Sequence, residues 1–199
     1  MSASAPEPAR PLDALLVAGR HGDADGDAVR FTSPSLAIVQ LTARRGRAGD
    51  VAASVRSAFG FDLPGAGVAA GFGDVEALSI QPDGWLILAP RGVEGALARA
   101  VTAAGLDAGS VVDQTHGKTL LRITGKRAAW VLAKECRVDL HPRAFGPGRV
   151  AGTAFAHLSC VVHQRDAAPI FDLIFAVTTA GSFVHALTHA AEETGYEVV

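Results

Sequence analysis

Apolar residues recur along the chain with two spacings, one typical of strands and one typical of helices. β-Branched or alternating apolar runs predict strands at residues 36–42, 75–81, 85–89, 111–115, 119–125, 150–163 and 171–177. Apolar positions three or four residues apart predict helices at residues 51–59, 93–104 and 127–135. A last helix, which stops at Gly195, presents an apolar stripe of Phe183, Leu187, Ala190 and Ala191.

Polar and glycine-rich segments predict the connections between these elements. Asp50 is placed to cap the helix at 51–59, and Gly60 is placed to end it. Pro82-Asp83-Gly84 predicts a turn between two strands. Residues 19–29 and 61–73 are rich in glycine together with Asp or Pro, so we expect both to be loops.

The predicted elements run β-α-β-β-α-β in the first half, and the second half again pairs strands with two helices. Because a helix must bury its apolar side against a sheet, we expect an α+β fold of two β-α-β-β-α lobes packed as one unit. The expected division is an N-terminal tail and loop at 1–30, a first lobe at 31–117 and a second lobe at 118–199.

Composition narrows the class of protein. The 199 residues are 49% hydrophobic and 19% charged, which suits a chain that buries a full core. The formal charge of −2 argues against binding to nucleic acid or anionic lipid through bulk charge. Two cysteines are too few for a disulfide scaffold. The N-terminal residues lack the pattern of a secretory signal and no apolar run is long enough to span a membrane, so we expect a cytoplasmic protein.

Three segments imitate ligand-binding motifs but lack required residues. Gly117-Lys118-Thr119 resembles the end of a phosphate-binding loop, yet it lacks the upstream glycine and precedes a predicted strand. The glycines of residues 65–71 have the wrong spacing for a dinucleotide site and precede a strand as well. Asp23, Asp25 and Asp27 are spaced like calcium ligands, but the later Gly and Glu of that loop are missing.

His157, Cys160 and His163 have side chains that suit zinc. On one regular strand His157 and His163 would share a face and Cys160 would point the other way. Only a bulge would bring the three together. We therefore expect no metal site, with Cys160 a small buried residue and both histidines on the face away from the core, either exposed or against a partner.

Asp, His and Arg side chains gather near predicted strand ends and loops, without a nucleophile motif beside them. We assign no catalytic, cofactor-binding or metal-binding residue to this chain. Polar and aromatic anchors of this kind are typical of interfaces between proteins. The residues that we expect at a partner interface are Asp113, His116, Asp139, His141, Arg143 and Phe145.

Four short motifs carry a family resemblance. They are Asp-Gln-Thr-His-Gly at 113–117, Leu-Arg-Ile-Thr-Gly at 121–125, Val-Asp-Leu-His-Pro-Arg-Ala-Phe at 138–145 and Ser-Phe at 182–183. With them the chain resembles the gamma subunit family of heterotetrameric sarcosine oxidase, from about residue 113 to residue 195. The Asp-Leu-His-Pro segment is the most specific of the four.

The second half is also similar to the tetrahydrofolate-binding aminomethyltransferase fold. That family opens one strand with a paired Asp-Asp-Leu, and the matching place here reads Phe171-Asp172-Leu173. Phe171 stands where the family has its catalytic carboxylate. The resemblance therefore implies an aminomethyltransferase-like fold without the folate chemistry.

The first resemblance implies a non-catalytic structural gamma subunit, with alpha, beta and delta subunits as partners. Such a complex oxidatively demethylates sarcosine to glycine and reduces oxygen to hydrogen peroxide, with formaldehyde or methylenetetrahydrofolate as the one-carbon product. FAD, FMN, NAD, tetrahydrofolate and zinc are then expected in the partner subunits and no prosthetic group in this chain. One alternative is an independent folate-binding one-carbon transfer protein that uses Asp172 with His157 or His163. Another is a subunit of a related N-methyl amine demethylase.

Overall fold

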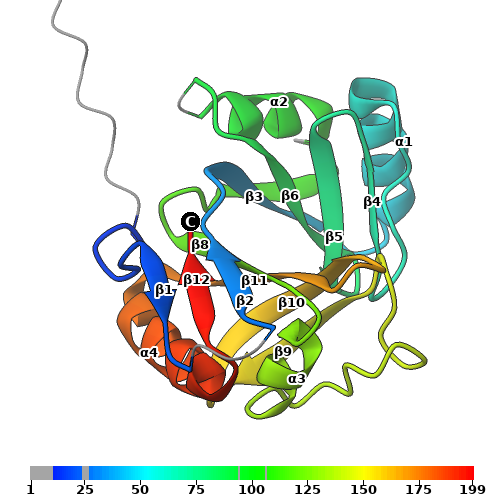
Figure 1. Cartoon of the computed structure of the whole chain (residues 1–199). Coiled ribbons are helices and arrows are strands. Elements are labelled where there is room, and N and C mark those ends of the chain that lie inside the picture. The colour runs from blue at the N-terminus through cyan, green and yellow to red at the C-terminus, as the bar shows by residue number, and fades with distance from the viewer. Residues whose placement is uncertain (1–10, 24–26, 94, 106) are drawn as a thin grey trace, which may run out of the picture.

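The computed structural model describes residues 11–23, 27–93, 95–105 and 107–199. Residues 1–10 of the expected N-terminal tail and loop, and Asp25 of the calcium-like motif, lie outside the described residues. Over the described ranges the chain forms two β-sheets with four α-helices (Figure 1). None of the helices in these ranges is long and apolar enough to cross a membrane.

The smaller sheet has five antiparallel strands in the order β4-β5-β6-β3-β7. Its strands are β3 (Leu36–Ala43), β4 (Ala69–Phe72), β5 (Val75–Gln81), β6 (Gly84–Pro90) and β7 (Gly109–Asp113). Two helices pack on one face of this sheet, α1 (Ala48–Phe59) and α2 (Ala96–Gly105). Val51 and Val55 of α1 and Val101 of α2 are almost fully buried against that face.

The larger sheet has seven strands in the order β1-β12-β2-β8-β11-β10-β9. Its strands are β1 (Gly19–His21), β2 (Val29–Thr32), β8 (Lys118–Thr124), β9 (Val150–Phe155), β10 (Leu158–Asp166), β11 (Ile170–Ala176) and β12 (Tyr196–Val198). Its helices are α3 (Ala128–Ala133) and α4 (Ala180–Ala191), with short 3₁₀ turns at Val177–Thr179 and Glu192–Thr194. Phe183 of α4 is fully buried and stacks on Phe175 of β11, with the ring centroids 3.8 Å apart.

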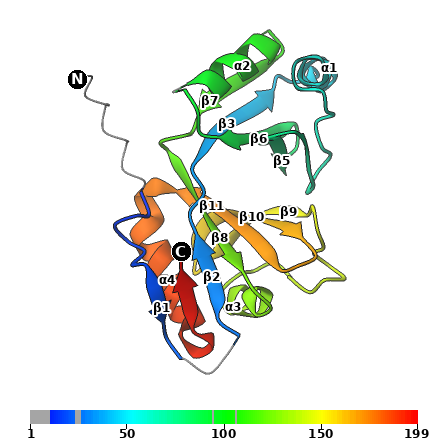
Figure 2. The same ribbon diagram turned by 45° about the horizontal axis from the view of Figure 1, so that its top comes forward.

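The faces of the two sheets that carry no helix pack against each other. Figure 2 shows α1 and α2 at one end of the molecule, α3 and α4 at the other, and the sheets between them. An apolar cluster between the sheets contains residues from both, among them Leu78 and Leu86 of the smaller sheet and Leu120 and Ile174 of the larger one. Most central strands are therefore covered on both faces. The predicted α+β fold with two lobes packed together is confirmed.

The larger sheet begins at the expected boundary after residue 117, but it also takes in strands from the N-terminal segment that was expected to be a tail and loop. β1 precedes the expected first lobe and β2 crosses its start at residue 31, yet both belong to the larger sheet, where β2 pairs with β8 and β12. The segments predicted as loops at 19–29 and 61–73 contain β1 and β4. Both strands are held by pairing with another part of the chain, β1 with β12 and β4 with β5. Such pairing stabilises a strand whose own sequence has weak strand propensity.

Two further predictions are wrong in detail. The single strand predicted at 150–163 is a hairpin of β9 and β10, which turns at Ala156 and His157. Both turn residues have positive φ angles, 47° and 66°, as the tightest hairpin turns require. Asp50 does not cap α1 from outside. It lies in the first turn of the helix, where it forms an ion pair with Arg47. Its negative charge there interacts favourably with the positive end of the helix dipole.

Candidate functional site

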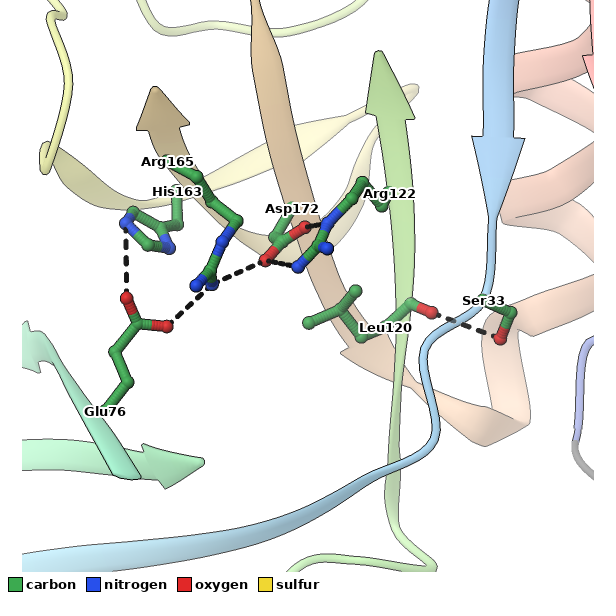
Figure 3. A network of polar contacts seen from close by, with 7 residues as sticks. All are labelled: Ser33, Glu76, Leu120, Arg122, His163, Arg165 and Asp172. Carbon is green, nitrogen blue, oxygen red and sulfur yellow. Dashed lines mark hydrogen bonds and ion pairs between the residues drawn. The ribbon is translucent and has the colours of Figure 1, made fainter. Parts of the chain in front are cut away.

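Charged side chains meet between the two sheets, at the side of the apolar inter-sheet cluster (Figure 3). They come from one strand of the smaller sheet and three neighbouring strands of the larger one. We call this group the inter-sheet network, and its members are Glu76 (β5), Arg122 (β8), His163 and Arg165 (β10) and Asp172 (β11). Residues of these strands alternate between the two faces of their sheet, so four of the five, all but Arg165, stand two places from an apolar residue of the inter-sheet cluster.

Asp172 is the centre of the network. Its side chain is fully buried, and Arg122 grips it with two parallel bonds, from Nε to Oδ1 at 2.6 Å and from Nη2 to Oδ2 at 2.9 Å. The two residues are also paired directly across β8 and β11. A bidentate contact of this kind fixes the orientation of the two side chains in addition to pairing their charges, which a single hydrogen bond does not.

Arg165 joins the two sheets. Its Nη1 donates to Oδ2 of Asp172 at 3.0 Å and to Oε2 of Glu76 at 2.7 Å. Burial alone would lower the pKa of Arg165, but the two carboxylates around it raise that pKa above the ordinary value. The guanidinium is therefore permanently charged and holds one carboxylate from each sheet.

His163 lies directly opposite Asp172 in the β10–β11 register and is 2% exposed. Its Nε2 is 3.9 Å from Oε1 of Glu76, and its Nδ1 has no hydrogen-bond partner. Burial lowers the pKa of His163 below its ordinary value of 6.5, against the opposing effect of Glu76 and Asp172. At neutral pH the imidazole is uncharged, and the positive charges of the two arginines balance the negative charges of the two carboxylates.

This arrangement suits a structural role better than proton transfer. A general acid or base must reach a proton of its substrate, whereas Asp172 is inaccessible and both of its oxygens already accept bonds from arginine. The network therefore serves to hold the two sheets together through ion pairs.

The sequence contained a signal for part of the network. Arg122 interrupts the apolar run of β8, and Asp172 interrupts that of β11. Charged residues inside strands that are buried on both faces must find partners, so opposite charges in two such strands predict that those strands are neighbours. Glu76 and Arg165 lie toward strand ends among other polar residues and carry no such signal.

Four of the expected interface residues belong to the segment that follows α3. Oδ1 of Asp139 accepts a hydrogen bond from the backbone N–H of His141 at 2.9 Å, and Nδ1 of His141 accepts one from the backbone N–H of Arg143 at 3.2 Å. These three residues are exposed. Phe145 is instead a core residue, 4% exposed and packed in the cluster beneath α3 and α4, which corrects the expectation of a surface anchor there.

The other two expected interface residues lie at the end of β7, in the smaller sheet. Oδ1 of Asp113 accepts the backbone N–H of Thr115 at 2.9 Å, and Nε2 of His116 lies 3.4 Å from Nη2 of Arg91. Burial would raise the pKa of Asp113, but the bonds from Thr115 and the nearby His116 and Arg91 lower it. Both Asp113 and His116 are exposed. The six residues thus belong to two separate segments on different sheets.

The residues of the zinc-like motif do not converge. Cys160 lies in the core cluster under α3 and α4, as expected, and burial with the nearby Cys136 raises the pKa of its thiol to about 12. His163 points the other way, into the inter-sheet network, and is not on an exposed face. His157 stands on the hairpin turn, where its Nδ1 lies 3.4 Å from Nη2 of Arg137. The structure thus brings His163, but not His157, beside Asp172.

Comparison with known proteins identifies relatives over most of the chain. The model of the "Sarcosine oxidase, gamma subunit family" matches residues 45–193. Sarcosine oxidase subunit gamma of Arthrobacter sp. is 35% identical over 150 residues, which cover 74% of this chain and 72% of that protein. Sarcosine oxidase subunit gamma of Corynebacterium sp. (strain P-1) is 40% identical over 108 residues, 53% of each chain.

Solved structures show the same fold. A chain of the heterotetrameric sarcosine oxidase from Corynebacterium sp. U-96, in complex with pyrrole 2-carboxylate, matches with a TM-score of 0.76 and 28% identity over 86% of this chain and 87% of that one. The glycine cleavage system aminomethyltransferase T from Bartonella henselae matches with a TM-score of 0.66 and 12% identity, over 87% of this chain and 48% of that chain. At that identity the second match shows the fold alone.

Proposed function

The chain belongs to the sarcosine oxidase gamma subunit family, and on that premise we propose that it is a non-catalytic, structural subunit of a heterotetrameric sarcosine oxidase. The membership confirms the resemblance carried by the motifs between residues 113 and 183. The complex oxidatively demethylates sarcosine to glycine and reduces oxygen to hydrogen peroxide. Its one-carbon product is formaldehyde or methylenetetrahydrofolate.

One observation carries the structural role. Asp172 occupies the place in this fold where the sequence suggested residual one-carbon chemistry, and it is fully buried with both oxygens bonded to Arg122 and Arg165. A carboxylate so engaged contributes to the packing of two sheets and offers nothing to a substrate. Tetrahydrofolate chemistry that uses Asp172 with His157 or His163 does not fit this geometry.

The proposal places the partners and the redox groups outside this chain. Alpha, beta and delta subunits complete the heterotetramer, and FAD, FMN, NAD, tetrahydrofolate and zinc belong to them. The larger subunits hold the flavin against the substrate, because hydride transfer needs that alignment. This chain contributes surface and rigidity to the assembly.

Co-expression with the three partner subunits, followed by purification on a tag carried by this chain, tests the proposal. We expect a yellow complex that oxidises sarcosine. The Asp172→Asn variant keeps the shape of the carboxylate but removes its charge. We expect it to lower the yield of complex while leaving turnover per bound flavin unchanged.

Two results would contradict the proposal. If Asp172→Asn assembled normally and lost turnover, the residue would act in catalysis. If a colourless single chain were recovered although the partners are expressed and folded, the chain would act independently. Titration of that chain with tetrahydrofolate would then test the one-carbon alternative.

A further inference from the structure

Trp130 of α3 is turned outward. Ala128, Val131 and Leu132 of the same helix are fully buried, whereas Trp130 is 40% exposed. Trp85, the other tryptophan, is 7% exposed and donates its indole N–H to the carbonyl of Pro64. Tryptophan is costly to leave in water and is among the residues most enriched in the energetic centres of interfaces.

Cations hold the Trp130 ring in place. Nζ of Lys134 lies 4.0 Å from the ring centroid, and the guanidinium carbon of Arg127 lies 5.6 Å from it. Lys134 is itself fixed, because its Nζ donates to the carbonyl of Ala190 at 2.7 Å and to Glu193 at 3.0 Å. An aromatic ring that is ordered before binding loses little conformational entropy on binding.

A hollow of about 610 Å³ adjoins the exposed ring. It runs between α3 and the segment at 137–142, and Trp130, Arg137, Asp139 and His141 line it together with smaller apolar residues. The hollow therefore connects Trp130 to two of the residues that the sequence suggested for a partner interface. An open depression beside an anchored aromatic ring is the shape that receives a protruding side chain of another protein.

Charge indicates the chemistry of that other protein. Residues 126–149 contain six Lys or Arg and two Asp or Glu, a net charge of +4, and the region still carries +2 when Asp27 and Glu193, which pair with Lys126 and Lys134, are included. Three of the cations, Arg127, Lys134 and Arg137, stand beside the ring or line the hollow. Such a local excess of positive charge speeds and orients association with a negatively charged surface.

We propose that Trp130 and the adjoining hollow form a docking surface for an acidic, aromatic-accepting patch on a partner subunit. The inference rests on the proposed function, because it assigns the place where this chain enters the complex. It makes Trp130 the anchor of that contact. Arg127, Lys134 and Arg137 form its cationic rim.

A competition experiment in the assembled complex tests the anchor. Wild-type chain and a Trp130→Ala variant, with different tags, are expressed together with the partner subunits, and their ratio in the purified complex is compared with their ratio in the soluble extract. Loss of an interface anchor weakens binding by about 30-fold, so we expect the variant to be depleted to that degree. Phe72→Ala is the matched control, because Phe72 is 70% exposed on β4 of the other sheet.

The cationic rim is tested in the same way with Arg137→Glu. Reversal of one rim charge is expected to deplete the variant about fivefold and to reduce the effect of added salt on assembly. Arg45→Glu is the control, since Arg45 is also exposed but follows β3 in the smaller sheet. Equal depletion of both variants would show that only net charge matters and would overturn the assignment.

The remaining outcomes separate this inference from the function on which it rests. If wild-type chain enters the complex and Trp130→Ala enters it equally well, the docking surface is wrong and the subunit role stands. If Trp130 instead mediates association between two copies of this chain, sedimentation of the purified chain will show a dimer that Trp130→Ala abolishes, which also overturns the inference. If wild-type chain enters no complex, the proposed function fails and the inference fails with it.

Discussion

The larger sheet buries its two faces in different ways. The face toward α3 and α4 is apolar, with phenylalanine rings from β9, β11 and α4 packed together. The face toward the smaller sheet mixes apolar residues with Arg122, His163, Arg165 and Asp172. Apolar burial is strong but has little preference for one position over another. The ion pairs have fixed directions and fixed partners.

This difference suggests a division of labour between the two layers. The helix-facing layer supplies most of the free energy of folding, because apolar burial dominates that quantity. The inter-sheet network ties the two sheets together, since Arg165 bonds Glu76 of the smaller sheet and Asp172 of the larger one.

Among the variants that this comparison suggests, Phe183→Ala is expected to lower the free energy of unfolding most. Phe183 is fully buried, stacks on Phe175 and lies 5.3 Å from the ring of Phe155. Truncation leaves a cavity, and we expect a loss of about 4 kcal/mol in the free energy of unfolding. Urea denaturation at low and high salt measures it, and the loss should be the same at both. If the variant does not fold, Phe183→Leu gives a smaller loss with the same independence of salt.

Asp172→Ala gives the next largest effect, through a different mechanism. It leaves Arg122 and Arg165 half-buried without their shared partner, and we expect a loss of about 3 kcal/mol. The double variant Arg122→Met/Asp172→Leu replaces the pair with apolar side chains and leaves Arg165 bonded to Glu76. It should recover most of the loss in urea denaturation. A double variant as unstable as the single one would show that the ion pair itself is strongly stabilising and would remove the distinction between the layers.

The sequence predicted the apolar layers better than the contacts between them. The run of β11 predicts a strand because Phe171, Leu173 and Phe175 repeat every second residue. The same alternation puts Asp172 on the opposite face, but it does not say what lies there. The partners of Asp172 come from β8 and β10, which only the folded sheet brings beside it. Long-range pairing also explains why β1 and β12, three residues each, were not predicted.

Errors at the candidate site came from local geometry. Ala156 and His157 are not typical turn residues, so the hairpin between β9 and β10 was predicted as one strand. His163 was expected on the face opposite Cys160 and lies there, but that face is buried because the smaller sheet covers it. At the segment after α3 the sequence predicted polar residues on the surface, and Asp139, His141 and Arg143 are exposed. Phe145 was included with them because aromatic residues are common both in interfaces and in cores.

His163→Leu is expected to change stability least, and it tests whether the network excludes a proton from the folded chain through the pH dependence of unfolding. Its pKa is lowered by burial from 6.5, so the unfolded chain binds a proton that the folded chain excludes. Stability from this residue is then complete above about pH 6.5 and falls as the pH decreases toward the lower folded-state pKa. His163→Leu breaks no hydrogen bond, because Nδ1 has no partner and Nε2 is 3.9 Å from Glu76. We expect the variant to unfold at about the same temperature as wild type at pH 8. Between pH 7 and pH 5 its unfolding temperature should fall less than that of wild type. If the wild-type curve is instead matched by the variant at every pH, His163 titrates in the folded chain as freely as in the unfolded one, and the network is open to water.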